Sequence, residues 1–204
     1  ICESRLKMLL MYYFDNTYSE RIGKQIIVIE SDIKDPSFKE KIIQYDFDTI
    51  INCAASVKHF AVGNALEEIN YLSVKRLVDF SLEQNKKFIQ VSTLSVAGEN
   101  VNDKFDDQTK LKENMLWFGQ DLENKYAKTK FDAEKYVLET IQTQGLQGKI
   151  IRVGNLMSRY VDGEFQINFT TNAFMSRLKA IVELGCFSVD DLATLVEFSP
   201  IDSV

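Results

Sequence analysis

The chain has 204 residues, 45% of them hydrophobic, and its 30 acidic residues exceed its 24 basic ones to give a formal net charge of −6. This length supports one globular domain with a substantial core, and the acidic balance disfavours nucleic acid as a partner. Three cysteines without a CxxC pair and one histidine support neither a disulfide framework nor a metal site, and they favour a reducing, cytoplasmic compartment. The apolar runs stay well short of the roughly 20 residues that span a membrane, so the sequence predicts no membrane segment.

The hydrophobic pattern predicts short strands that alternate with longer amphipathic helices. The expected elements, in chain order, are a helix with Leu6, Leu9, Leu10 and Tyr13 on one face, strands at 25–30 and 49–53, a helix at 65–84, a strand at 87–91, a helix at 124–144, a strand at 149–153 and a helix near 172–184. Continuous β-branched runs separated by helices are typical of a parallel sheet with helices on both faces. The sequence therefore predicts an α/β fold with a doubly wound parallel sheet.

In such sheets ligands bind at the carboxyl ends of the strands, and four predicted strand ends carry suggestive side chains. In chain order they are Ser31-Asp32-Ile33, Cys53-Ala54-Ala55-Ser56, Ser92-Thr93-Leu94-Ser95 and Gly154-Asn155. Asp32 offers a carboxylate to an adenine amino group, and Ile33 offers an apolar surface to its ring. Each segment alone is explained as well by helix capping, turn formation or close packing. Their recurrence at one sheet edge favours a ligand cleft.

Tyr126 and Lys130 form the most informative pair, because a spacing of four places both side chains on one face of a helix. An ammonium beside a phenol favours the phenolate, which lowers the tyrosine pKa toward the range of catalytic proton transfer. A second pair at the same spacing, Tyr71 and Lys75, lies inside a predicted helix with no hydroxyl-bearing strand end before it. We therefore assign Tyr126 and Lys130 to the functional site, and the other pair to the surface.

Other chemically active residues have simpler explanations. His59 follows the small-residue turn and is interpreted as an ordinary histidine rather than a residue of the site. Cys53 is expected to be a buried, small apolar residue, because no neighbouring base is evident. The acidic stretch Asp103–Asp107, with Glu113, is interpreted as a solvated loop of the kind that often acts as a lid in α/β enzymes.

Eight segments of the sequence match motifs of a known enzyme family. They are RLKMLLMYYF (5–14), SDI (31–33), INCAASV (51–57), NYLSVKRLVDFS (70–81), VSTLSVAG (91–98), YAKTKFDAEKYV (126–137), RVGNLMSRYVDGEFQIN (152–168) and EFSPID (197–202). In this order they resemble the extended short-chain dehydrogenase/reductases. The closest resemblance is to the thioester reductase branch, the terminal reductase domains of nonribosomal peptide synthetases, related to carboxylic acid and fatty acyl reductases. The last two segments are the specific ones, because a sugar-nucleotide epimerase would share only the middle motifs.

The resemblance implies a Rossmann-like fold, NADP(H) as the cofactor and a catalytic set of four residues. Thr93 would hydrogen-bond the substrate carbonyl, and Tyr126 would donate a proton to the oxygen that gains negative charge. Lys130 would hold the nicotinamide ribose and tune Tyr126, and Asn70 would support Lys130 through a water molecule. The implied cofactor contacts are Arg5, Asp32, Ile33, Ala54, Ala55, Tyr126, Lys130, Val153 and Asn155.

These implied contacts divide along the dinucleotide. Asp32 and Ile33 would flank the adenine, and Ala54 and Ala55 would line the cofactor. Val153 and Asn155 would contact the nicotinamide end. Arg5 matches a position that meets the 2′-phosphate of NADPH in this branch, and it is equally explained as an ordinary surface arginine.

The implied reaction is NADPH-dependent reduction of an acyl or peptidyl thioester that a carrier protein holds on phosphopantetheine. Thr93 and Tyr126 would stabilise the hemithioacetal oxyanion, which collapses to an aldehyde and a free thiol, and a second hydride would give an alcohol. The partner would be the upstream carrier domain of the same parent chain. Two alternatives stay open: a sugar-nucleotide epimerase or dehydratase-like enzyme, and a non-catalytic docking module of the same fold. The intact catalytic set favours an enzyme.

The family's Gly-rich phosphate turn is absent from these residues, and we expect it before Ile1. Residues 1–204 alone are therefore expected to lack the pyrophosphate site and to be inactive. Val153 stands where many relatives carry proline, in agreement with the thioester reductase branch. We assign residues 1–155 to a partial cofactor-binding domain and residues 156–204 to the start of a truncated substrate-binding region.

Overall fold

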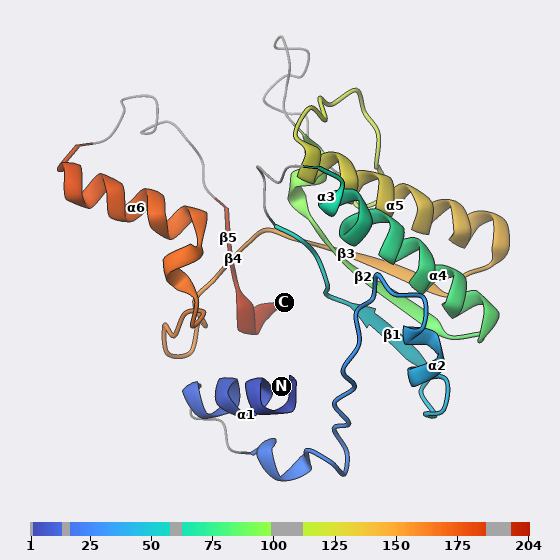
Figure 1. Cartoon of the computed structure of the whole chain (residues 1–204). Coiled ribbons are helices and arrows are strands. Elements are labelled where there is room, and N and C mark those ends of the chain that lie inside the picture. Colours follow the sequence, from blue (N-terminus) through green and yellow to red (C-terminus); the bar gives the residue numbers. More distant parts are fainter. Residues whose placement is uncertain (1, 14–16, 58–62, 99–111, 187–196) are drawn as a thin grey trace. The chain divides into compact units, whose positions relative to one another are not determined.

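The structure is a computed structural model that describes residues 2–13, 17–57, 63–98, 112–186 and 197–204 (Figure 1). The chain divides into two compact units, one of residues 31–153 and the other of residues 1–30 together with 154–204. His59 and the stretch Asp103–Asp107 lie outside the described residues. The functional division at residue 155 remains a prediction.

A parallel three-stranded sheet is the centre of the unit 31–153 (Figure 1). Its strands are β1 (Thr49–Asn52), β2 (Lys87–Thr93) and β3 (Gly148–Val153), in the order β1-β2-β3. β1 pairs with β2 as far as Asn52 opposite Gln90, and β2 pairs with β3 as far as Thr93 opposite Val153. The predicted strands at 49–53, 87–91 and 149–153 are confirmed, and so is the α/β class. Because β2 continues past the end of β1, Thr93 lies at the carboxyl edge of the sheet.

Two long helices, α4 (Ser73–Glu83) and α5 (Lys125–Gln144), lie side by side against the sheet (Figure 1). The predicted helix at 65–84 is confirmed, but it is not uniform. α3 (Ala65–Glu67) continues through a π-helical turn at Glu68–Leu72 into α4. Such turns are frequent at functional sites, and this one contains Asn70.

The core between the helices and the sheet is apolar. Its buried members are Phe38 of the short helix α2 (Phe38–Ile42), Val74, Leu77, Val78, Phe88, Ala133, Val137 and Leu146. Phe88 on β2 and Val137 on α5 are both 0% exposed, and burial of each such side chain contributes about 1.5–3 kcal/mol. This packing holds α5 over β2, so that the first turns of α5 reach the carboxyl end of the strand.

The second unit contains the first helix and the end of the chain. Its elements are α1 (Cys2–Tyr12), short 3-10 turns at Ser19–Arg21, Phe169–Thr171 and Ile201–Ser203, α6 (Ala173–Leu184), and the parallel strands β4 (Asn155–Met157) and β5 (Phe198–Pro200). The Tyr13 hydroxyl donates a hydrogen bond to the Phe165 carbonyl at 3.2 Å, and the Arg159 guanidinium lies 5.3 Å from the centre of the Tyr13 ring. These contacts join the end of α1 to the segment that follows β4.

The predicted strand at 25–30 does not form. Ile26 makes an isolated bridge with Ile22, and residues 27–30 have no regular secondary structure. A β-branched run becomes a strand only where a neighbouring strand completes its backbone hydrogen bonds, and the described part of the chain provides none here. The predicted helices at the start of the chain, at 124–144 and near 172–184 are confirmed as α1, α5 and α6.

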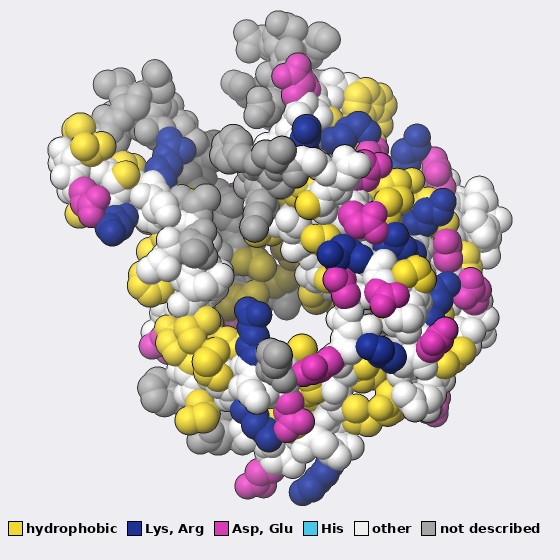
Figure 2. Space-filling model, viewed as in Figure 1, with side chains coloured by type: hydrophobic (Ala, Val, Ile, Leu, Met, Phe, Trp, Pro, Cys, Tyr) yellow, Lys and Arg dark blue, Asp and Glu magenta, His cyan; other side chains and the backbone are white. Residues whose placement is uncertain are grey.

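The surface over α4 and α5 carries both signs of charge, as Figure 2 shows. Ion pairs on it include Lys128 with Asp132, Lys135 with Glu139 and Arg76 with Glu68. Interspersed charges produce no single-sign field of the kind that steers a polyanion. Among the described helices, none combines the length and the apolar character needed to cross a membrane.

Candidate active site

Tyr126 lies in the first turn of α5, where a cap fixes the start of the helix. Asn124 is the N-cap, and its side-chain oxygen accepts hydrogen bonds from the backbone N–H of Tyr126 at 2.9 Å and of Ala127 at 3.2 Å. An asparagine cap contributes about 1 kcal/mol to helix stability. The Tyr126 residue is 8% exposed, so its ring lies inside the unit.

Thr93 ends β2 and caps the short 3-10 helix at Leu94–Ala97. Its hydroxyl oxygen accepts a hydrogen bond from the backbone N–H of Ser95 at 3.1 Å, and its side chain lies close enough to Tyr126 to affect the pKa of that phenol. The structure thus brings Thr93 and Tyr126 together at the carboxyl edge of the sheet, as the sequence predicts.

The pKa of Tyr126 differs from the sequence expectation. Burial raises this pKa above its ordinary value of 10.0, and the hydrogen bond with Thr93 acts in the opposite direction. The predicted lowering by Lys130 is therefore wrong in direction, because burial disfavours the phenolate more than its surroundings stabilise it. Tyr126 is protonated at neutral pH, which is the state that a proton donor requires.

Lys130 lies one helical turn after Tyr126 and is 3% exposed. Its ammonium donates a hydrogen bond to the Val91 carbonyl of β2 at 2.9 Å. Burial lowers the pKa of Lys130, and the Glu134 carboxylate and then Cys53 oppose this shift. The buried ammonium therefore depends on nearby acceptors and negative charge to remain protonated.

Glu134 and Arg152 form a buried ion pair that sequence reasoning missed. Glu134 is 0% exposed, and the Arg152 guanidinium donates to its carboxylate at 2.8, 3.0 and 3.2 Å. Arg152 also donates to the carbonyls of Met115 at 3.0 Å and Lys112 at 3.3 Å, which holds that segment on the sheet edge. The available sequence signal was a glutamate four residues after Lys130 on the same helical face.

Asn70 is 1% exposed and clamps the turn that follows β1. Its amide nitrogen donates to the Ser56 carbonyl at 3.0 Å, and its oxygen accepts from the Ser56 N–H at 2.7 Å. The same amide nitrogen lies 3.3 Å from the Thr129 hydroxyl on α5. These contacts give Asn70 a direct structural role, and its water-mediated support of Lys130 remains a prediction.

A buried chain of amides connects the end of β1 with Lys130. Ala54 N–H donates to the Asn52 side-chain oxygen at 3.1 Å, and Asn52 donates to the Gln90 oxygen at 2.9 Å. Gln90 in turn donates at 2.7 Å to the Val91 carbonyl, the acceptor that Lys130 also uses. The sequence signal is a polar residue inside an otherwise apolar run, Asn52 in β1 and Gln90 in β2.

The end of β1 offers an open surface to a flat ligand. Ala54 and Ala55 are exposed, and small side chains at this position let a ligand approach the backbone. Cys53 is also exposed, so the prediction of a buried cysteine is wrong; it follows the last residue of β1 that pairs with β2. Val153 lies half-buried at the end of β3 in the same unit. These residues fit a dinucleotide lying across the strand ends.

Asp32 and Ile33 follow the segment that was predicted as the first strand. Asp32 is exposed, and its carboxylate accepts a hydrogen bond from the Lys34 N–H at 2.9 Å. This bond holds the pKa of Asp32 below its ordinary value. Ile33 is half-buried, so one part of its side chain is open to a ligand.

Arg5 and Asn155 belong to the other unit. Arg5 is exposed on α1. Asn155 begins β4, where its N–H donates to the Glu197 carboxylate at 3.0 Å and its side-chain amide donates to the Glu197 carbonyl at 3.0 Å. A Cβ at Gly154 would overlap the same carboxylate, so a larger residue there would have to displace the Glu197 side chain. The two sequence blocks most specific to the thioester reductase branch therefore contact each other directly.

A cavity of about 500 Å³ opens beside Tyr126. Its lining residues are Ser95, Gly98, Asp121, Glu123, Asn124, Tyr126 and Ala127. Gly98 has a φ of 63°, and a Cβ at this position would overlap the Asp121 carbonyl. Glycine thus lets the end of the 3-10 helix approach the loop that leads into α5, and this approach shapes the cavity.

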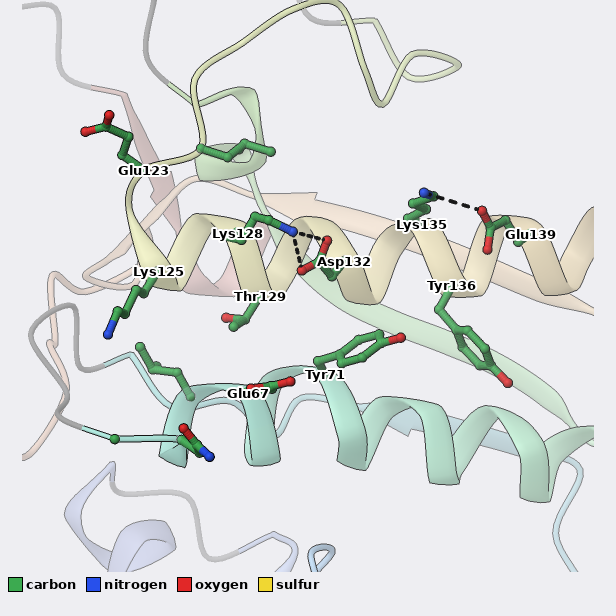
Figure 3. Close-up of a pocket in the computed structure, with 14 residues that line it drawn as sticks. Glu67, Tyr71, Glu123, Lys125, Lys128, Thr129, Asp132, Lys135, Tyr136 and Glu139 are labelled. Atoms are coloured by element: carbon green, nitrogen blue, oxygen red, sulfur yellow. Dashed lines mark hydrogen bonds and ion pairs between the residues drawn. The ribbon is translucent and has the colours of Figure 1, made fainter.

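A second groove, of about 570 Å³, lies on the outer side of α5 and faces α3 and the π-helical turn (Figure 3). Its lining, within the described residues, includes none of the four predicted catalytic side chains. Tyr71 lies in this groove, and the exposed Lys75 places its ammonium 5.3 Å from the centre of the Tyr136 ring. Tyr71 and Lys75 therefore lie away from the sheet edge that carries Thr93.

The parallel α/β sheet, the Tyr-Lys pair on a capped helix and the strand-end threonine define an extended short-chain dehydrogenase/reductase, in agreement with the sequence. The chain belongs to the NAD-binding family described as male sterility protein, which it matches over residues 2–204. This membership establishes a nicotinamide cofactor for the family. No curated protein matches the chain.

Three solved structures are similar to the chain. A thiolation-reductase di-domain from an archaeal non-ribosomal peptide synthetase is 39% identical with a TM-score of 0.87, over 98% of this chain and 43% of its own. The Aureusimine biosynthetic cluster reductase domain is 31% identical with a TM-score of 0.63, over 78% of this chain and 41% of its own. The terminal R domain from the myxalamid PKS-NRPS pathway, at 24% identity and a TM-score of 0.75 over 92% of this chain and 47% of its own, shows the fold alone.

The chain spans less than half the length of each of these structures. A dTDP-glucose 4,6-dehydratase and a UDP-glucuronic acid 4-epimerase, both in complex with NAD, are 21% and 22% identical to the chain and share its fold. The predicted resemblance to the thioester reductase branch is confirmed.

Proposed function

We propose that the full-length protein reduces an acyl or peptidyl thioester held by a carrier domain, with NADPH as the reductant, and so releases an aldehyde or an alcohol. The observation that supports this most is the buried set at the sheet edge, in which Tyr126 lies beside Thr93 and Lys130 occupies the next turn of α5. The 39% identity with a thiolation-reductase di-domain supports a carrier-bound substrate and a carrier domain as the partner.

The chemistry follows from the positions of these side chains. When bound, the nicotinamide supplies a hydride to the carbonyl carbon. The adjacent hydroxyls of Thr93 and Tyr126 stabilise the negative charge that develops on the carbonyl oxygen, and Tyr126 transfers its proton to that oxygen. The buried Lys130 ammonium stabilises the phenolate that remains. The hemithioacetal then expels its sulfur, which takes the hydroxyl proton, and an aldehyde and a free thiol are left.

The residues proposed to hold the cofactor are those that the family resemblance implies. They are Arg5, Asp32, Ile33, Ala54, Ala55, Tyr126, Lys130, Val153 and Asn155. An ammonium has three N–H donors, and in the described part of the chain Lys130 directs one to Val91, so others are available to a ribose hydroxyl. Arg5 is the reason that NADPH is proposed rather than NADH, because its guanidinium suits a 2′-phosphate.

The test is reduction of a carrier-bound thioester by the full-length protein, with NADPH oxidation followed by absorbance and the released product identified by mass spectrometry. The proposal predicts that aldehyde or alcohol appears in step with NADPH consumption. Cofactor binding without any product would favour the non-catalytic docking module. Turnover of a sugar nucleotide, with the thioester untouched, would favour the epimerase or dehydratase alternative.

A further inference from the structure

The Arg152 guanidinium divides its donors between two groups of partners. Its Nε and Nη2 donate to the Glu134 carboxylate at distances of 2.8, 3.0 and 3.2 Å. Its Nη1 donates to the main-chain carbonyls of Met115 at 3.0 Å and Lys112 at 3.3 Å. Glu134 lies on α5 and is 0% exposed, so it holds the guanidinium in one position. The two carbonyls are therefore fixed near the end of β3, which carries Arg152.

Residues 112–123 lead into α5 with neither a helix nor a strand of their own. The position of this segment therefore depends on side chains that anchor its main chain. Arg152 anchors its beginning. Gln120, which is 3% exposed, anchors its end, because its amide nitrogen donates to the Val96 carbonyl at 3.0 Å and to the Leu116 carbonyl at 2.8 Å.

The anchored segment forms one wall of the cavity of about 500 Å³ beside Tyr126. Asp121 and Glu123 line the cavity from this segment, and Ser95 and Gly98 line it from the 3-10 helix and its end. In the proposed reaction the thioester carbonyl lies at Tyr126, so this space receives the group attached to that carbonyl. Carboxylates only accept hydrogen bonds, so this wall suits a peptidyl group, whose N–H groups donate them.

We infer that Arg152 is a positioning residue for substrate binding, which holds residues 112–123 as the wall that a peptidyl group contacts. The inference rests on the proposed function and assigns peptidyl rather than short acyl thioesters as its substrate class. Arg152 acts through the carbonyls of Lys112 and Met115. A guanidinium has five donors in a fixed fork, so one side chain binds the Glu134 carboxylate and both carbonyls at once.

The test compares Arg152→Lys with wild type in the full-length protein, on a dipeptidyl and on an acetyl thioester of the same carrier domain. The lysine keeps a positive charge beside the buried Glu134 carboxylate, but its single ammonium cannot also hold both carbonyls. KM for the dipeptidyl thioester should rise about fivefold or more, while KM for the acetyl thioester and both kcat values stay within about twofold of wild type. Hydrogen exchange should become faster at the N–H groups of residues 112–121 and stay unchanged in α5.

The matched control is Arg76→Lys. Arg76 on α4 donates to the Glu68 carboxylate at 2.6 Å, and neither residue is among the described residues that line the cavity. This variant should keep KM for both thioesters. A second anchor variant, Gln120→Met, keeps a side chain of similar size and removes both N–H donors. It should repeat the selective rise in KM, and it tests the wall even where Arg152→Lys does not fold.

Two results would overturn the inference. One is a rise in KM that is absent, or equal for the two thioesters, in both anchor variants. The other is unchanged hydrogen exchange at residues 112–121 in Arg152→Lys. A wild-type protein that reduces neither thioester would instead overturn the proposed function and the substrate class together, and the exchange measurement would then decide by itself whether Arg152 holds the segment.

Discussion

The buried ammonium of Lys130 serves the proposed catalysis but lowers the stability of the fold. The Lys130 residue is 3% exposed, and burial lowers the pKa of its ammonium. A buried charge costs free energy unless its partners compensate. Among the described residues, this compensation comes from the Val91 carbonyl and the Glu134 carboxylate. The carboxylate is shared, because it also accepts hydrogen bonds from Arg152. Lys130 is therefore expected to lower stability in return for catalysis.

We expect Lys130→Met to raise the free energy of unfolding by on the order of 1 kcal/mol at neutral pH, and to lower turnover by on the order of 10². Below the lowered pKa of folded Lys130, both the folded and the unfolded state carry the proton, so the penalty is complete. The penalty disappears as pH rises from that pKa toward the ordinary value of 10.5. Denaturant unfolding of wild type and variant at neutral and alkaline pH measures this. A variant that is less stable at neutral pH would contradict the account.

Arg5 is the residue on which the choice of cofactor depends. A charge-assisted hydrogen bond contributes about 1.5–3 kcal/mol, or roughly ten- to a hundredfold in discrimination. We expect the full-length protein to prefer NADPH over NADH, and Arg5→Ala to remove most of that preference. The measurement is kcat/KM with each cofactor, and Lys7→Ala on the same helix is the matched control. An unchanged ratio in Arg5→Ala would leave Arg5 as a surface residue.

At the scale of an element, the start of α5 determines where Tyr126 lies. Asn124 caps the helix, and Gly98 lets the preceding loop approach the 3-10 helix that Thr93 caps. The N-terminal turn of a helix is held by few hydrogen bonds, so loss of the cap frays that turn first. Tyr126 is in that turn, and Lys130 lies one turn deeper. A change in the cap should therefore affect the phenol more than the ammonium.

We expect Asn124→Ala to lower the free energy of unfolding by about 1 kcal/mol and to reduce turnover several-fold, because the phenol is less firmly placed. Asn124→Asp keeps an oxygen that accepts from the same N–H groups, so it should retain both stability and rate. Thermal unfolding and steady-state kinetics on the two variants provide the comparison. Equal activity of Asn124→Ala and wild type would show that the cap does not position Tyr126.

At the scale of the whole molecule, local signals in the sequence predicted the elements well. The β-branched runs gave β1, β2 and β3, and the amphipathic periods gave α1, α5 and α6. Residues 25–30 have the same local pattern but no pairing partner among the described residues, so local pattern alone was insufficient. The convergence of Thr93 with Tyr126 was implied by the family resemblance, and it is realised because Thr93 ends β2 and Tyr126 lies in the first turn of α5.

Contacts between distant residues were not predictable in the same way. Glu134 with Arg152, and Asn52 with Gln90, are buried polar pairs whose partners lie on different elements. The π-helical turn contains Asn70, which bonds to Ser56, and this turn has no periodic signal in the sequence. Burial of Tyr126 also reversed the expected direction of its pKa shift. These features depend on packing, which composition and spacing do not encode.

The most direct test of the account compares the two Tyr-Lys pairs of the chain by Tyr→Phe substitution in the full-length protein. Tyr126→Phe removes the proton donor and keeps the ring, so kcat for thioester reduction should fall by on the order of 10² or more, with NADPH affinity little changed. Tyr71→Phe, in the outer groove, should keep kcat within about twofold of wild type. Near-normal reduction by Tyr126→Phe, or an equal loss in both variants, would contradict the assignment of Tyr126 as the proton donor.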